Sequence, residues 1–367
     1  MRRGIIARAL ALASVVTLVA AGCTRGGEGD GDGGNGGGQA RQSLLQVVQE
    51  RGALRCGVNA TVPGFGFETG EGVIEGFDVD FCKAIAAAVF GTAEVDDLIE
   101  LVPVDADQRF SQLRAGRYDV LVRNTTWTSS RDGTEGIAFA HPNFYDAQGM
   151  MVRQGEFGSI EDMGGVTVCV TAGTTTELNL ADYFQTLNLD FTPLVLEDND
   201  QILEAFRAER CDGWTSDLSQ LAGLRSQFEE ELGALEIFDD VMSKEPLAPG
   251  VIDGDADWYD VVNWVVNGLI LAEELGVTSE NVTQEAENPS TPSIASLLGV
   301  SFQGDEDVNF EHGLSIDDTF MQNVLAAVGN YGEIFDRHIG ADSPLELDRG
   351  LNALWTEGGI QYGMPFR

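Results

Sequence analysis

Short apolar runs alternate with segments of helical periodicity along most of the chain. In the first third, apolar residues dominate 53–58 and 100–104, and each run has the length of a buried strand. Between these runs, apolar side chains recur at helical spacing, as at Cys82, Ile85 and Val89. This alternation predicts an α/β fold with a mainly parallel sheet.

The same alternation resumes further along the chain, with predicted strands at 166–171, 191–196 and 211–215. Extended segments at 149–153 and 243–251 precede and follow this second unit, and we interpret them as crossovers. The order predicts two α/β lobes joined by a two-strand hinge, with a ligand cleft between them. We assign 43–148 plus 249–367 to lobe 1 with a C-terminal extension, and 149–248 to lobe 2. The role of the acidic segment 281–318 stays open, and the tail 350–367 is expected to pack on lobe 1.

One strand end carries the strongest candidate site. Within 119–146, an apolar run ends in a series of amide and hydroxyl side chains that includes Asn124 and Thr126, and the cation Arg131 follows. An arginine can hold a carboxylate through two parallel bonds, and hydroxyls can occupy the remaining lone pairs. The stretch therefore predicts a binding loop for a small anion at the end of a strand.

A second candidate lies in the other predicted lobe. Thr174, Thr175 and Thr176 follow a predicted strand and open a helix, where free N–H groups and hydroxyls suit an anion. A plain threonine cap is the alternative interpretation. Asp217 ends another strand and could hold an ammonium opposite the anion site. Phe65, in a Gly-rich loop, is a candidate aromatic ligand contact, although a plain surface turn fits that loop equally well.

The first residues have the features of a targeting segment. Basic residues precede the apolar run 9–21, which is too short to span a bilayer, since a span needs ~20 residues. The small residues before Cys23 are typical of a lipoprotein signal peptide at 1–22, with Cys23 lipidated; an ordinary cleaved signal peptide is the alternative. The polar, Gly-rich stretch 23–42 would be a flexible tether that holds an extracytoplasmic domain at the cell membrane.

Charge excludes one class of partner. The formal net charge is −39, which we interpret as a solvated acidic surface. Such a field repels nucleic acid and anionic lipid. We therefore expect no nucleic-acid partner, and membrane contact only through the lipid anchor.

Besides Cys23, the chain has Cys56, Cys82, Cys169 and Cys211. An even number of cysteines in an exported protein indicates disulfides. We predict the pairs 56–82 and 169–211, one in each lobe, although the sequence leaves the other two pairings open. No CxxC spacing occurs and the histidines are far apart in the sequence, so we expect no metal and no cofactor.

Several longer motifs resemble those of one protein family. They are GFDVDFC at 76–82, RNTTWTSSR at 123–131, GTTTELNLADY at 173–183, SKEPL at 243–247, VGNYGEIF at 328–335 and RGLNALW at 349–355. On these motifs the chain resembles the type II solute-binding proteins of amino-acid ABC importers, most of all the general L-amino-acid-binding branch. The resemblance implies a Venus-flytrap fold, a monomer, and delivery of an L-amino acid to permease subunits in the membrane.

The resemblance also implies roles for single residues. Arg131 matches the arginine that clamps the ligand α-carboxylate, and Asn124 and Thr126 match ligand contacts from the first lobe. Thr175 matches a second-lobe threonine that also holds the carboxylate. Asp217 matches the aspartate that receives the α-ammonium.

Two further positions bear on specificity. Arg109 lies where acidic-amino-acid binders have an arginine that contacts the ligand side chain. Asn59 stands where many relatives have aspartate. Which amino acids are bound, and how broad the range is, the sequence leaves open.

Other functions on the same fold remain alternatives. A dehydratase-like enzyme would need a carboxylic acid over the reacting carbon of its ligand, and Asp217 is the single carboxylate in the predicted site loops. A sensor domain would have to signal in trans, because no transmembrane segment follows. We therefore expect a non-enzymatic receptor.

Overall fold

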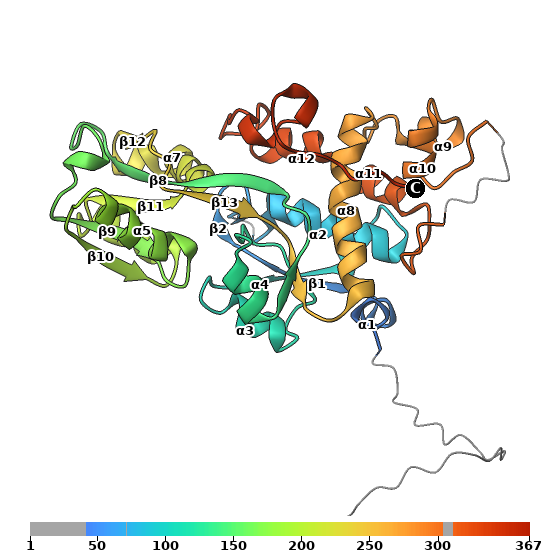
Figure 1. Cartoon of the computed structure of the whole chain (residues 1–367), viewed down its shortest axis with the longest axis horizontal. Coiled ribbons are helices and arrows are strands. Elements are labelled where there is room, and N and C mark those ends of the chain that lie inside the picture. The colour runs from blue at the N-terminus through green and yellow to red at the C-terminus, as the bar shows by residue number, and fades with distance from the viewer. Residues whose placement is uncertain (1–41, 71, 304–310) are drawn as a thin grey trace, which may run out of the picture. The chain divides into compact units, whose positions relative to one another are not determined.

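The computed structural model describes residues 42–70, 72–303 and 311–367. The signal peptide predicted at 1–22, Cys23 and almost all of the tether predicted at 23–42 lie outside the described residues. The described part is an α/β fold, as predicted, in which each of two lobes has a mixed sheet covered by helices (Figure 1).

The sheet of the first lobe has the strand order β5-β1-β6-β14-β7. Its strands are β1 (Leu54–Val58), β5 (Ile99–Pro103), β6 (Val120–Leu121), β7 (Ile137–Phe139) and β14 (Gly250–Ile252). β5, β1 and β6 run parallel, whereas β14 is antiparallel to both of its neighbours. β14 follows the second lobe in the sequence, so the chain returns to this sheet.

Helices and a small sheet complete the first part of this lobe. They are α1 (Leu44–Arg51), α2 (Phe77–Phe90), α3 (Arg109–Arg114), α4 (Ser129–Glu135), β2 (Thr61–Val62), β3 (Gly66–Glu68), β4 (Ile74–Glu75) and the 3-10 turn η1 (Asp96–Leu98). On β1, Cys56 and Val58 belong to the core that includes α2. Gly57 faces the other way, where a Cβ atom would lie 2.7 Å from the Tyr118 ring. Opposite faces of one strand thus fill two cores.

The sheet of the second lobe has the order β10-β9-β11-β8-β12, and β13 also pairs with β8. Its elements are β8 (Phe144–Arg153), η2 (Ile160–Asp162), β9 (Val166–Thr171), α5 (Thr175–Thr186), β10 (Phe191–Leu196), α6 (Asn199–Arg207), β11 (Gly213–Asp217), α7 (Leu218–Leu232), β12 (Leu235–Ile237) and β13 (Ser243–Leu247). On β9, Val168 and Val170 pack in a cluster with Leu180 of α5, whereas Cys169 packs in a cluster with Phe206 of α6. The sheet is therefore buried on both faces, as its apolar strands require.

β8 and β13 form the connection between the lobes. They pair antiparallel from Phe144 opposite Leu247 to Gln148 opposite Ser243, and Figure 1 shows both strands running from one lobe to the other. The crossover predicted at 149–153 is wrong, because these residues pair with β11 and β12 inside the second sheet. The lobe boundaries of the sequence analysis stay a prediction.

The C-terminal part packs on the first lobe. Its elements are α8 (Ala256–Glu274), α9 (Val282–Glu287), α10 (Pro292–Leu297), α11 (Phe320–Val328), α12 (Tyr331–His338), η3 (Gly350–Asn352) and η4 (Trp355–Glu357). The tail lies on α8, as predicted: Met364 N–H donates to Asn267 (3.2 Å) and the Phe366 ring meets Trp264. No helix in the described residues is long and apolar enough to cross a membrane.

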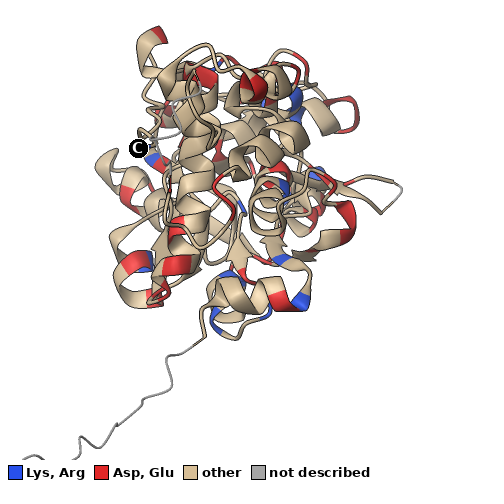
Figure 2. Cartoon of the chain, turned by 90° about the vertical axis from the view of Figure 1, so that its right-hand side faces the viewer, with Lys and Arg blue, Asp and Glu red and all other residues tan. Residues whose placement is uncertain are grey.

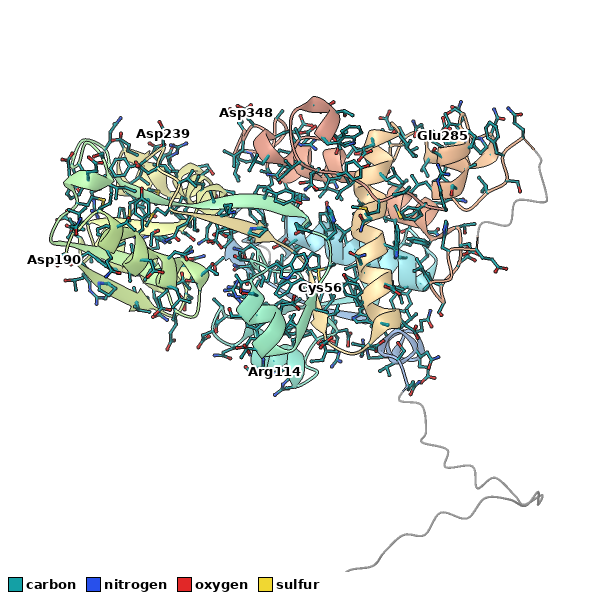
Figure 3. All side chains as sticks on the ribbon, in the orientation of Figure 1. Cys56, Arg114, Asp190, Asp239, Glu285 and Asp348 are labelled. Atoms are coloured by element: carbon teal, nitrogen blue, oxygen red, sulfur yellow. A yellow bond between two sulfur atoms is a disulfide. The ribbon has the colours of Figure 1, made fainter. Side chains whose placement is uncertain are left out.

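Both predicted disulfides are present. Cys56 on β1 bonds Cys82 on α2, and Cys169 on β9 bonds Cys211 just before β11. Cys56 lies among the packed side chains of the first lobe (Figure 3). Each bridge thus fastens a helix or loop to the sheet of its own lobe.

Acidic residues outnumber basic ones by 60 to 21. Figure 2 shows acidic positions spread over the helices and loops of the face it presents. Asp190 and Asp239 lie at the periphery of the second lobe (Figure 3). This distribution fits the predicted solvated acidic surface.

Candidate functional site

A cavity of about 180 Å³ lies between the lobes, next to the strand ends that the sequence analysis singled out. Its lining includes Asn59, Arg109, Arg123, Asn124, Thr126 and Arg131 from the first lobe, and Thr174, Thr175, Thr176, Asn199, Asp217 and Gln220 from the second. Every predicted ligand contact except Phe65 is therefore brought to this one cavity.

Arg131 lies in the first turn of α4, where the sequence analysis expected a loop. The Thr128 hydroxyl accepts the Arg131 N–H (3.3 Å) and so caps this short helix. Nη1 of Arg131 donates to the carbonyl oxygen of Thr126 (2.8 Å). A guanidinium has five N–H donors, so this bond leaves donors for a ligand carboxylate. Burial lowers the pKa of Arg131, and the negative charge of Glu245 opposes that shift.

Asn124 connects the two lobes at the cavity wall. Its φ of 28° is unusual for a residue other than glycine, and its N–H donates to Asp78 Oδ2 (2.7 Å). Its side chain accepts from Asn59 Nδ2 (3.2 Å) and donates to Gln220 Oε1 (3.4 Å). Asn59 in turn accepts from the Thr61 N–H (3.0 Å). This network of amides therefore passes from β1 to α7.

Arg123 and Asp78 are two buried ionisable groups beside Asn124. Arg123 Nε donates to the carbonyl oxygen of Val104 (2.7 Å). Burial lowers the pKa of Arg123 to about 10. Burial raises the pKa of Asp78 to about 7, although the Asn124 N–H and the charge of Arg123 oppose that rise. Asp78 thus holds the loop that carries Asn124.

Arg109 begins α3 and is 3% exposed. Its Nη2 donates across the cleft to the carbonyl oxygen of Gly173 (3.2 Å). Its buried Nε has no hydrogen-bond partner among the described residues. Burial, together with the positive charges of Arg131 and Arg123, lowers its pKa well below the usual value. Such a group favours a negatively charged or strongly accepting neighbour.

The second lobe contributes the start of α5. Thr174 caps this helix by accepting the Glu177 N–H (3.1 Å), and its hydroxyl also bonds that of Thr176 (2.8 Å). The first N–H groups of a helix have no partner within the helix and carry partial positive charge. Thr175 and Thr176 thus bring helix N–H groups to the cavity wall.

Asp217 ends β11 and is 6% exposed. Burial raises its pKa well above the usual value, and the negative charges of Asp146 and Glu245 raise it further. Hydrogen bonding from Asn124 and the charge of Arg109 oppose that rise. A cation bound beside Asp217 would lower this pKa and so favour the ionised carboxylate.

Phe65 is not a cavity residue, so the predicted ligand contact is wrong. Its side chain is 1% exposed and lies edge-on to the rings of Phe77 and Phe144, with ring centroids 5.8 Å and 5.1 Å apart. The turn closes because Gly76 packs on the Phe65 carbonyl, which a Cβ atom would meet at 2.2 Å. The aromatic ring is therefore directed into the core.

Several residues of this site were not predicted from the sequence. Arg123, Asn199 and Gln220 line the cavity, and Glu245 of β13 accepts hydrogen bonds from Thr126 and Thr175 behind it. Arg123 could have been found, since it directly precedes Asn124 in the hydroxyl-rich stretch. Asn199 and Gln220 carry no local signal, because they reach the cavity only when α6 and α7 pack.

The cavity thus has opposite charges from different lobes. Arg131 in the first lobe and the α5 N-terminus in the second can hold a carboxylate. Asp217 can hold an ammonium. A small zwitterion fits this arrangement when both lobes contact it.

Comparison with known proteins identifies the family. Residues 54–284 match the model of the bacterial extracellular solute-binding proteins, family 3. The chain belongs to this family.

Similar proteins align with this solute-binding protein over most of its length. The general L-amino acid-binding periplasmic protein AapJ of Rhizobium johnstonii is 44% identical over 89% of this chain and 94% of its own. The glutamate/glutamine/aspartate/asparagine-binding protein BztA of Rhodobacter capsulatus is 41% identical over 90% of this chain and 95% of its own. A periplasmic binding protein from Brucella ovis with glutathione bound is 41% identical, with a TM-score of 0.83 over 89% of this chain and 100% of that structure. These relatives are named as binding proteins, not as enzymes.

Proposed function

We propose that this protein is the extracytoplasmic substrate-binding component of an amino-acid ABC importer and binds an L-amino acid between its lobes. The observation that carries the proposal is that Arg131 and Asp217 come from different lobes and line one cavity. Arg131, with the N–H groups of Thr175 and Thr176, receives the α-carboxylate. Asp217 receives the α-ammonium. The names of AapJ and BztA support this ligand class.

Closure follows from the same arrangement. Hydrogen bonds to charged groups contribute about 1.5–3 kcal/mol each. A zwitterion that contacts both lobes therefore stabilises their closed arrangement relative to an open one. The closed lobes are the form that permease subunits in the membrane would recognise, and the receptor acts as a monomer without catalysing a reaction.

The ligand side chain is acidic or an amide. The buried charged residues of the lining are Arg109, Arg123 and Arg131 against Asp217, whereas its other acidic residues, Asp105, Glu197 and Asp198, are exposed or half-buried. Arg109 lines the cavity, and its guanidinium offers donors to a side-chain oxygen. BztA is named for glutamate, glutamine, aspartate and asparagine, and the Brucella protein binds glutathione, which carries a γ-glutamyl group.

The protein is held at the cell membrane by a lipid on Cys23, and the stretch 23–42 tethers the binding domain. The apolar run before Cys23 and the Gly-rich composition after it support this assignment. A Cys23→Ser variant expressed in a bacterial host should leave the membrane fraction, and mass spectrometry of the wild-type N-terminal peptide should detect the lipid. An unmodified Cys23 would contradict the anchor.

Calorimetric titration of the purified domain with each common L-amino acid tests the receptor function. We expect tight binding of L-glutamate, L-glutamine, L-aspartate or L-asparagine, with the ligand recovered unchanged. Binding of none of the amino acids would contradict the receptor function. Conversion of a bound candidate to a product would favour a dehydratase-like enzyme instead.

A further inference from the structure

Glu245 is a buried carboxylate at the junction of the two lobes. It lies on β13, one of the two strands that connect the lobes, and is 1% exposed. No ligand-binding role was predicted for its segment from the sequence. Its position behind two threonines of the cavity wall gives it a part in ligand recognition.

Donors from both lobes meet on this carboxylate. The Thr126 hydroxyl of the first lobe donates to Oε2 (2.6 Å), and so does the Thr175 hydroxyl of the second lobe (2.7 Å). Asn179 Nδ2 donates to Oε1 (3.0 Å), and the Ser243 hydroxyl donates to the same oxygen. The carboxylate is thus well supplied with donors even though it is buried.

The two threonine hydroxyls have one proton each. A carboxylate only accepts hydrogen bonds, whereas a hydroxyl offers one donor and two lone pairs. The short bonds to Glu245 have the length of charge-assisted O–H···O⁻ bonds. The contact between the Thr126 and Thr175 oxygens is longer, at 3.3 Å. Both protons are therefore directed at Glu245, and only lone pairs remain for a ligand.

We propose that Glu245 is a positioning residue that turns the Thr126 and Thr175 hydroxyls into acceptors and so selects ligands with an α-ammonium group. The inference rests on the proposed function. The ammonium N–H groups are shared between Asp217 and these two oxygens. The α-carboxylate is held by Arg131 and by helix N–H groups, so the Thr175 hydroxyl does not hold it, in contrast to the role implied by the resemblance.

The α-keto acid of the same carbon chain is the informative competitor. It keeps the carboxylate and the side chain, but places a carbonyl oxygen where the amino acid has its ammonium. That oxygen would face acceptors at Thr126 and Thr175 and would have no donor there. The site should therefore discriminate against α-keto acids partly through Glu245.

Glu245→Gln tests this role, because its amide donates and thereby frees a threonine proton for the ligand. Affinities are measured by calorimetric competition for L-glutamate with α-ketoglutarate and for L-aspartate with oxaloacetate. We expect amino-acid affinity to fall by about tenfold or more, with α-keto acid affinity unchanged or higher. Glu245→Asp keeps the acceptor and should retain most of the selectivity. Glu177→Gln is the control, because it alters a carboxylate in the first turn of α5 that accepts the Gly173 N–H. This variant should retain all of the selectivity.

If Glu245→Gln loses affinity by the same factor for the amino acid and its α-keto acid, Glu245 has a purely structural role and the inference is overturned. No loss of amino-acid affinity would also overturn it. If the wild type binds no amino acid, the proposed function itself fails. If it binds but Glu245→Gln keeps the selectivity, only the inference about Glu245 fails. Neutron diffraction of the complex with a bound amino acid provides a test without a variant. Deuterium atoms of Thr126 and Thr175 should point at Glu245, and a deuterium pointing at the ligand carboxylate would overturn the inference.

Discussion

A Cβ atom on Gly223 of α7 would lie 2.7 Å from the carbonyl oxygen of Pro63 in the first lobe. The second lobe thus touches the first at a glycine, away from the connecting strands. Nearby, Asn199 Nδ2 donates to the Thr61 hydroxyl (3.2 Å). These contacts belong to the closed arrangement, because they join elements of different lobes.

Gly223→Ala should weaken ligand binding without weakening the fold. Crowding of this kind costs about 1–3 kcal/mol, which here falls on the closed arrangement only. In the ligand-free protein, alanine favours the helix by up to about 1 kcal/mol relative to glycine. Calorimetry should show lower affinity, and thermal unfolding should show equal or higher stability.

Gly133→Ala in α4 is the matched control, since a Cβ atom there meets nothing within 4 Å. It should bind ligand as the wild type does. Wild-type affinity in Gly223→Ala would show that the lobes need not approach this closely.

Ligand affinity should rise with pH. The pKa of Asp217 is raised by burial, and that of Asp146 beside it is raised to about 6. A ligand ammonium favours ionised Asp217, so binding releases a proton wherever the free protein is protonated. Below the raised pKa, affinity should therefore increase by up to about tenfold per pH unit.

Calorimetry in buffers of different ionisation enthalpy measures the released proton directly. Asp217→Asn should bind weakly and without this pH dependence. Affinity that does not fall as the pH is lowered would contradict the assignment of Asp217.

The contribution of Asp78 to the stability of the ligand-free protein should fall as pH rises from about 4 to about 7. The pKa of Asp78 is raised from 3.8 to about 7, so in this window the folded state binds more protons than the unfolded state. This contribution is therefore greatest at the acidic end and is lost as pH rises toward the folded-state pKa, by a few kcal/mol at most.

Asp78→Asn should flatten this dependence, since asparagine has no proton to lose and its amide oxygen can still accept the Asn124 N–H. Denaturant unfolding of both proteins across the window measures the difference. Equal slopes would mean that other groups cause the pH dependence.

Much of the site could be predicted because it lies at strand ends. Arg131 and Asp217 each follow a predicted strand, and parallel strands bring such ends to one edge of the sheet in each lobe. The disulfide pairs were predictable because each links segments close in sequence, 26 and 42 residues apart.

Long-range packing limited the rest. Glu245 lies next to Thr126 and Thr175 in space, yet 119 and 70 residues from them in the chain. Phe65 was assigned to the cavity because an aromatic residue in a Gly-rich loop fits either a core or a binding site. The packing of this turn against Gly76 decides that the Phe65 ring lies in the core.

Arg109 should determine the side-chain preference. Arg109→Ala removes the guanidinium from the cavity wall and also the bond to Gly173, so part of the affinity loss should be equal for every ligand. The rest of the affinity loss should be confined to ligands with acidic or amide side chains. We expect the affinity ratio of L-glutamate to L-leucine to decrease by about tenfold, corresponding to one hydrogen bond to a charged group. An unchanged ratio would place side-chain recognition elsewhere.

Titration of the preferred amino acid into Arg131→Ala tests the central claim most directly. Arg114→Ala is the matched control, because Arg114 lies on the outside of α3 (Figure 3), pairs with Glu135 and does not line the ligand cavity. We expect Arg131→Ala to lose at least about tenfold in affinity for every amino acid that the wild type binds, since a charged hydrogen bond contributes about 1.5–3 kcal/mol. Arg114→Ala should bind normally. Near wild-type affinity in a folded Arg131→Ala protein would contradict the carboxylate clamp.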